Sequence, residues 1–110
     1  MYSKELLKGT LRTIVLQLLR EQERLYGYEI TQMVRKKTGD KIQLTEGALY
    51  PTLHKLVAEG LLQTESEYHG KRLRKYYSLT QAGQTAASDR VAEFADFVQT
   101  MERLLGLKPS

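Results

Sequence analysis

The sequence predicts a mainly α-helical domain that carries one small β-hairpin. Three stretches in the first sixty residues place apolar side chains at intervals of three and four, as amphipathic helices do. Residues 61–79 hold two strand-like runs around a glycine-containing turn, which indicates a hairpin. Residues 81–105 repeat apolar residues with heptad spacing, which predicts a long helix that packs against another helix.

The first helix is expected from Lys4 to Arg20, and the second from around Tyr26 to Lys37. Gly39 suits the left-handed conformation that ends many helices. The three basic residues in the last turn before it interact favourably with the negative, C-terminal end of the helix dipole. The apolar stripe that predicts the first helix consists of Leu7, Leu11, Ile14, Val15 and Leu18.

The third helix is expected to be capped by Thr45 and to stop at Gly60. Pro51 leaves two alternatives open. Inside the helix it would remove one backbone hydrogen bond and crowd the carbonyl of Gly47. Otherwise the regular helix begins near Leu49, with Pro51 in its first turn. The buried face is expected to hold Leu49, Leu53, Leu56 and Val57.

The hairpin is expected to consist of strands at 61–68 and 72–79, joined by a turn at 69–71. Its first strand is polar, so the hairpin is expected to lie on the surface with one face covered.

The last helix is expected to be capped by Thr80 and to run from Gln81 to about Leu105. A helix of about 25 residues is about 37 Å long, more than a small three-helix core can cover. Its far half is therefore expected to pack on a second copy of the chain; the alternative is that it folds back onto its own domain. The seam consists of Ala87, Val91, Phe94, Val98, Met101 and Leu105.

Composition argues against several classes of function. The chain has no cysteine and only two histidines, far apart, so no disulfide, metal site or catalytic triad is expected. No paired carboxylates, metal-ligand spacing or phosphate loop stand out, so we predict neither an enzyme nor a cofactor. The apolar runs are too short to span a membrane and the N-terminus does not resemble a signal peptide, so a cytoplasmic protein is expected.

The basic charge is unevenly distributed. The net charge is +4, and residues 1–83 hold 14 bases against nine acids. This pattern suggests a polyanion partner, although charge alone does not separate a nucleic-acid surface from a solvated basic loop. The densest cluster lies in the hairpin, at Lys71, Arg72, Arg74 and Lys75.

Three helices, a hairpin and a long helix, in that order, form a winged helix-turn-helix with an added dimerisation helix. In that architecture the third helix enters the DNA major groove, and the hairpin, or wing, reaches neighbouring phosphates or the minor groove. We expect residues 1–80 to form the DNA-binding domain and residues 81–110 the dimerisation helix, within one compact unit.

Four stretches resemble the PadR family of bacterial transcriptional regulators. They are LYGYEI (25–30), LTEGALYPTLHKL (44–56), EGLL (59–62) and RKYYSLTQAG (74–83), and the resemblance covers residues 4–105. The single helix after the wing is similar to the short-form subgroup. The resemblance implies a homodimer that binds a two-fold related operator, usually as a repressor, and releases it on meeting a small molecule.

Candidate DNA contacts lie at the starts of the second and third helices and in the wing. The second helix offers backbone N–H groups to a phosphate, and one of Tyr26 and Tyr28 is expected in the core. Gly47 allows close approach but could be a simple helix-start glycine; His54 could be half-buried without a role. The predicted contacts are Tyr26, Gly27, Thr45, Gly47, Tyr50, Thr52, His54, Lys55, Lys71, Arg72 and Arg74.

Two further alternatives concern the wing and the seam. Arg74 or Lys75 could pair with a carboxylate of the first strand instead of contacting DNA. An apolar space lined by Phe94, Phe97 and Val98 could admit a flat hydrophobic or aromatic effector; the alternative is a dry seam. The chain has no tryptophan, so an indole platform found in some relatives is absent. A winged-helix module that binds an acidic protein instead of DNA is the second function considered.

Overall fold

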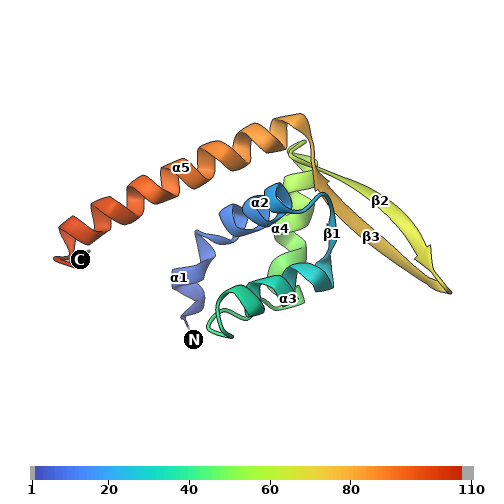
Figure 1. Cartoon of the computed structure of the whole chain (residues 1–110), viewed down its shortest axis with the longest axis horizontal. Coiled ribbons are helices and arrows are strands. Elements are labelled where there is room, and N and C mark those ends of the chain that lie inside the picture. The colour runs from blue at the N-terminus through green and yellow to red at the C-terminus, as the bar shows by residue number, and fades with distance from the viewer. Residues whose placement is uncertain (1, 108–110) are drawn as a thin grey trace.

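The computed structural model describes residues 2–107 and confirms a mainly helical fold with one hairpin (Figure 1). Residues 1 and 108–110, at the outer ends of the two predicted ranges, lie outside the described residues. The elements are α1 (Lys4–Lys8), α2 (Leu11–Glu21), β1 (Leu25–Tyr26), α3 (Gly27–Lys37), α4 (Glu46–Ala58), β2 (Leu62–His69), β3 (Arg72–Leu79) and α5 (Gln81–Leu104).

The expected first helix, Lys4 to Arg20, is instead two helices. Leu7 O accepts hydrogen bonds from both the N–H and the hydroxyl of Thr10, at 3.0 and 2.9 Å, which closes a tight turn and ends α1. Gly9 next to a threonine that competes for a backbone carbonyl accounts for this break. The prediction of one continuous helix is therefore wrong.

The core lies between α2, α3, α4 and the base of the sheet, and the first half of α5 packs along α2 (Figure 1). Full burial of one such aliphatic side chain contributes roughly 1.5–3 kcal/mol. The buried members are Val15, Leu16, Leu18, Leu19, Leu25, Ile30, Val34, Leu49, Leu53, Leu56, Leu62, Tyr77, Leu79 and Ala87.

Helix α4 is continuous through Pro51, so the first of the two alternatives is the one the structure adopts. The hydroxyl of Thr45 accepts a hydrogen bond of 3.2 Å from Ala48 N–H and caps the helix, as predicted. Gly60 follows the helix with a φ of 77°, a left-handed conformation that favours glycine.

The sheet has the antiparallel order β1-β3-β2. In the hairpin, Leu62 pairs with Leu79 and His69 with Arg72, which leaves a two-residue turn in which Gly70 has a φ of 66°. β2 therefore extends one residue further than expected and the turn is shorter. β1, which pairs Leu25 and Tyr26 with β3, was not predicted because two residues show no alternation.

One exposed ion pair joins α2 to the end of α4. The Arg12 guanidinium donates hydrogen bonds of 2.9 and 2.6 Å to the Glu59 carboxylate. This contact lowers the pKa of Glu59 below its ordinary value. A lowered pKa in the folded state adds stability that is present above the ordinary pKa and is lost as the pH falls through the folded one.

We therefore expect Glu59→Gln to lower the melting temperature slightly at pH 7, and we expect this penalty to shrink at pH 3, toward the lowered pKa of Glu59. The effect is small because both side chains are partly exposed. Thermal melts at the two pH values measure it, with Glu23→Gln as the control on an exposed carboxylate. A penalty that is equal at both pH values would contradict the assignment to the ion pair.

Candidate nucleic-acid interface

A groove of about 720 Å³ lies between the starts of α3 and α4 and the wing formed by β2 and β3. It brings together five of the predicted DNA contacts, which come from three separate parts of the sequence. Its lining consists of Tyr26, Gly27, Tyr28, Glu46, Tyr50, Arg72, Leu73, Arg74, Lys75 and Tyr77.

The exposed face of α4 continues the groove. Helical spacing places Gly47, Pro51, His54 and Lys55 opposite the buried leucines, and all four are exposed. A Cβ added at Gly47 would meet only Thr45 Oγ1, at 4.0 Å, so the first turn is open to close approach. His54 is therefore an exposed residue and not a half-buried one. The sequence did not lead us to name Pro51 as a candidate DNA contact, although its helical position opposite the leucines predicts that it is exposed on the same face.

The hydroxyls of two threonines predicted to contact DNA already make hydrogen bonds, one at the cap of α4 and one within the helix. The Thr45 hydroxyl caps the helix. The Thr52 hydroxyl donates to Ala48 O at 3.3 Å, and this residue is half-buried at the edge of the exposed face. Both hydroxyls retain a second hydrogen-bonding capacity, because a hydroxyl can donate one bond and accept two.

Gly27 lies beneath Tyr50. It is buried, and a Cβ at this position would lie 2.8 Å from Tyr50 Cζ and closer still to the phenol oxygen. The absence of a side chain thus lets the Tyr50 ring rest against the start of α3. That the backbone N–H of Gly27 faces a phosphate stays a prediction, and in the structure the missing side chain of Gly27 seats this ring.

One backbone N–H at the start of α3 is already hydrogen-bonded to a glutamate of the same helix. Glu29 Oε1 accepts a hydrogen bond of 3.1 Å from Tyr26 N–H. One backbone N–H group that the sequence offered to a phosphate is therefore already used. The glutamate three residues after the cap was the signal for this arrangement.

The tyrosines of this region are arranged differently from the prediction. Tyr28 is 57% exposed and Tyr26 is half-buried, so neither enters the core completely. Tyr76 is buried instead, with its ring 5.5 Å from that of Tyr26 in an edge-on contact. Tyr28, 6.5 Å from Tyr26, is an additional residue of the groove rim.

The basic side chains of the wing differ in their exposure. Lys71, Arg72 and Lys75 are exposed. The Arg74 guanidinium lies 4.5 Å above the Tyr26 ring, a cation–π contact that leaves it half-buried beside the groove. Neither Arg74 nor Lys75 pairs with the acids of β2; Arg24, which sequence reasoning left unassigned, takes that place.

The predicted seam on α5 divides in two. Ala87 is fully buried in the chain's own core, so its assignment to a dimer interface is corrected. Phe94, Phe97 and Val98, at 37%, 54% and 39% exposed, begin the uncovered part. Of the other seam residues, Val91 and Met101 are half-buried and Leu105 is exposed. The structure also exposes two apolar residues that were not predicted to lie in the seam, Leu6 of α1 and Leu104.

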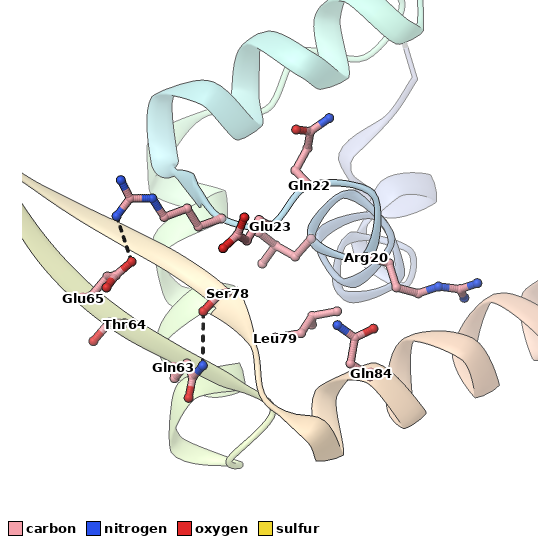
Figure 2. A pocket seen from close by; sticks show the side chains of 11 residues that line it. Arg20, Gln22, Glu23, Gln63, Thr64, Glu65, Ser78, Leu79 and Gln84 are labelled. Carbon is pink, nitrogen blue, oxygen red and sulfur yellow. Dashed lines mark hydrogen bonds and ion pairs between the residues drawn. The ribbon is translucent and has the colours of Figure 1, made fainter.

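A second hollow, of about 460 Å³, lies between the end of α2, the base of the wing and the start of α5 (Figure 2). Its lining is mainly polar and partly paired, for example Gln63 with Ser78 at 3.4 Å. Across residues 2–107, no helix is long and apolar enough to cross a bilayer, and no three His, Asp or Glu side chains are grouped to hold a metal ion.

Comparison with known proteins identifies relatives over most of the chain. Residues 15–89 match the "Transcriptional regulator PadR-like family". A PadR family transcriptional regulator from Eggerthella lenta has a similar structure, with a TM-score of 0.81 and 31% identity over 94% of this chain and 88% of that chain. The negative transcriptional regulator PadR of Bacillus subtilis is 30% identical over 99 residues, which make up 89% of this chain and 54% of that protein.

The structure of Bacillus subtilis PadR in complex with operator DNA matches with a TM-score of 0.67 and 30% identity, over 74% of this chain and 46% of that chain. This chain thus spans about half the length of that relative. The resemblance carried by the sequence motifs is confirmed, as is the winged-helix architecture. The chain belongs to the PadR-like family of transcriptional regulators, and it is not an enzyme.

Proposed function

We propose that this regulator binds double-stranded operator DNA as a homodimer, and that it represses transcription until a small hydrophobic or aromatic effector releases it. The observation that carries the proposal is the groove between α4 and the wing, which is rimmed by an exposed helix start and by basic side chains. The operator-bound structure of the Bacillus subtilis relative supports it. Because the partner is chromosomal DNA, we expect the protein to act in the cytoplasm.

The first turns of α4 are proposed to enter the major groove. The small residues Gly47 and Ala48 allow the backbone to approach base edges, and His54 and Lys55 follow on the same exposed face. α4 has no arginine for bidentate guanine recognition, so affinity is expected to come mainly from phosphate contacts. Lys71 and Arg72 at the wing tip would supply these at a neighbouring stretch of backbone.

Dimerisation is proposed to involve residues 81–110, through the uncovered part of the seam from Phe94 to Leu105. This part extends away from the core (Figure 1). A second copy fits this surface better than another partner, because two-fold related half-sites, roughly 34–36 Å apart, require a two-fold protein. In such a dimer Phe94, Phe97 and Val98 would line the space for an effector, which acts only if it binds one dimer arrangement better than the other.

A gel-shift assay with the DNA upstream of the protein's own gene, against an unrelated duplex and across a salt series, tests the proposal. We expect a specific complex with dimer stoichiometry that persists near physiological salt. Equal binding to both duplexes that vanishes as salt rises would reject it and would favour a winged-helix module for an acidic protein partner.

Two substitutions should distinguish, in the same assay, residues that contact phosphates from residues that read the base sequence. Lys71→Ala is expected to weaken binding to all duplexes and to reduce the salt slope by about one per wing. His54→Ala is expected to change the preference among operator variants by about 1–3 kcal/mol at one position. Lys36→Ala, at the far end of α3, is the control for loss of a positive charge. An equal loss on all duplexes from both substitutions would contradict the role given to His54.

A further inference from the structure

Arg24 stands between the body and the wing and holds two carboxylates at once. It lies in the segment between α2 and β1, and one guanidinium nitrogen is 2.8 Å from Glu65 Oε1 and 2.7 Å from Glu67 Oε2. Both acids belong to β2, and Figure 2 shows Glu65 at the end of the dashed line that marks the first of these pairs. One cation therefore serves two acids.

The position of Arg24 is fixed by a third contact. Its guanidinium carbon lies 4.0 Å above the ring of the buried Tyr76, on the strand next to β2. The Tyr76 hydroxyl is in turn 3.0 Å from His69 Nε2 near the wing tip. The ion pairs raise the pKa of Arg24 and lower the pKa of Glu67, so both stay charged at neutral pH.

The two acids matter because of where they lie. Glu65 and Glu67 pair across the hairpin with Tyr76 and Arg74, so they are on the strand beside the basic groove residues. The wing's base cluster, Lys71, Arg72, Arg74 and Lys75, carries four positive charges. Two unpaired carboxylates within the same hairpin would cancel half of that charge at the surface proposed to meet phosphates.

We propose that Arg24 is a positioning residue for DNA binding that acts by pairing with Glu65 and Glu67 and offsetting one of their two negative charges, without touching DNA itself. The inference rests on the proposed function. It explains how a wing with acids on its outer strand keeps more of its positive charge at the surface proposed to meet phosphates. It also gives a role to a residue that lies outside the α4–wing groove.

The test uses the full chain and the operator gel shift. Arg24→Gln should keep the helical circular dichroism spectrum and lower operator affinity on the order of tenfold, since unpaired like charges oppose the phosphates. Adding Glu65→Gln and Glu67→Gln to this variant should restore most of the affinity. Adding Glu93→Gln and Asp96→Asn instead, on α5, is the matched control for net charge and should not restore it.

The possible outcomes distinguish a failure of the role proposed for Arg24 from a failure of the proposed DNA binding. If the triple variant stays as weak as Arg24→Gln, then Arg24 contacts phosphate directly or merely anchors the wing, and the inference is overturned. Equal recovery in the α5 control would overturn it as well, because net charge alone would then suffice. If wild-type protein binds the operator and Arg24→Gln binds equally well, only the inference fails. If wild-type protein shows no specific complex, the proposed function itself fails.

Discussion

Gly83→Ala is expected to destabilise the fold by about 2 kcal/mol or more, although alanine is the better helix former. Gly83 is buried in the first turn of α5, and its Cα faces the backbone carbonyl of Leu61. A Cβ there would lie 3.0 Å from Leu61 C and well inside contact distance of its oxygen. That oxygen already accepts a hydrogen bond of 3.1 Å from Thr80 N–H, so moving it away would strain or break this bond.

The clash would act at the junction of three elements. The Thr80 hydroxyl donates to Gly60 O at 2.7 Å and accepts from Gly83 N–H at 3.0 Å, which ties the end of α4 and the start of β2 to α5. Separating α5 from this junction would loosen both the wing base and the long helix.

Thermal and urea unfolding measure the effect of Gly83→Ala, and a loss of about 2 kcal/mol corresponds to a fall of roughly 10 °C in a domain of this size. Gly47→Ala is the matched control, because its added methyl group, in another helix, would meet only Thr45 Oγ1 at an ordinary contact distance of 4.0 Å. We expect the control to be neutral or slightly stabilising. Similar melting temperatures for Gly83→Ala and wild type would show that the junction can relax, against this expectation.

The predictable parts of the fold are those that local signals specify. The cap at Thr45 and the leucines spaced along α4 suffice for that helix, and Gly70 between two strand-like runs suffices for the hairpin. The break at Gly9 was missed because the apolar stripe continues through it. The spacing of apolar residues does not show where a helix ends, and the structure buries none of the residues of α1.

The candidate site was predictable in its residue types and not in its contacts. Nothing in the spacing shows that Gly27 seats the Tyr50 ring or that Arg24 reaches β2, 41 residues away. Both follow from tertiary packing, in which β1 joins the sheet and brings the end of α2 beside the wing. Ala87 was assigned to the wrong partner for a related reason: a heptad pattern predicts a helical neighbour but does not say that α2 supplies it for the first half of α5.

The remaining half of α5 leads to the second large effect. α5 has 24 residues and is thus about 36 Å long, and its exposed apolar side chains occur beyond the part that packs on α2. Val98 lies near the middle of this uncovered stretch and is 39% exposed in the single chain. A charge placed there costs the single chain little, whereas a dimer seam would have to bury it unpaired.

Val98→Glu is therefore expected to convert the proposed dimer into folded monomers at micromolar concentration, as sedimentation or light scattering would show. A monomer engages one half-site at a time, so operator affinity should fall on the order of 10²–10⁴-fold as the second, intramolecular contact is lost. Binding to a single half-site should change little, because α4 and the wing are untouched. This combination separates lost dimerisation from a damaged DNA surface.

Thr100→Glu is the matched control, since it adds the same charge two residues away on the opposite, exposed face of α5. It should remain dimeric and bind the operator as the wild type does. If Val98→Glu also remains dimeric, the copies associate through another surface, and the exposed apolar residues of α1, such as Leu6, become the next ones to substitute. If it becomes monomeric but keeps full operator affinity, the two half-sites are not read by one dimer, and the two-fold operator would be the part of the proposal to abandon.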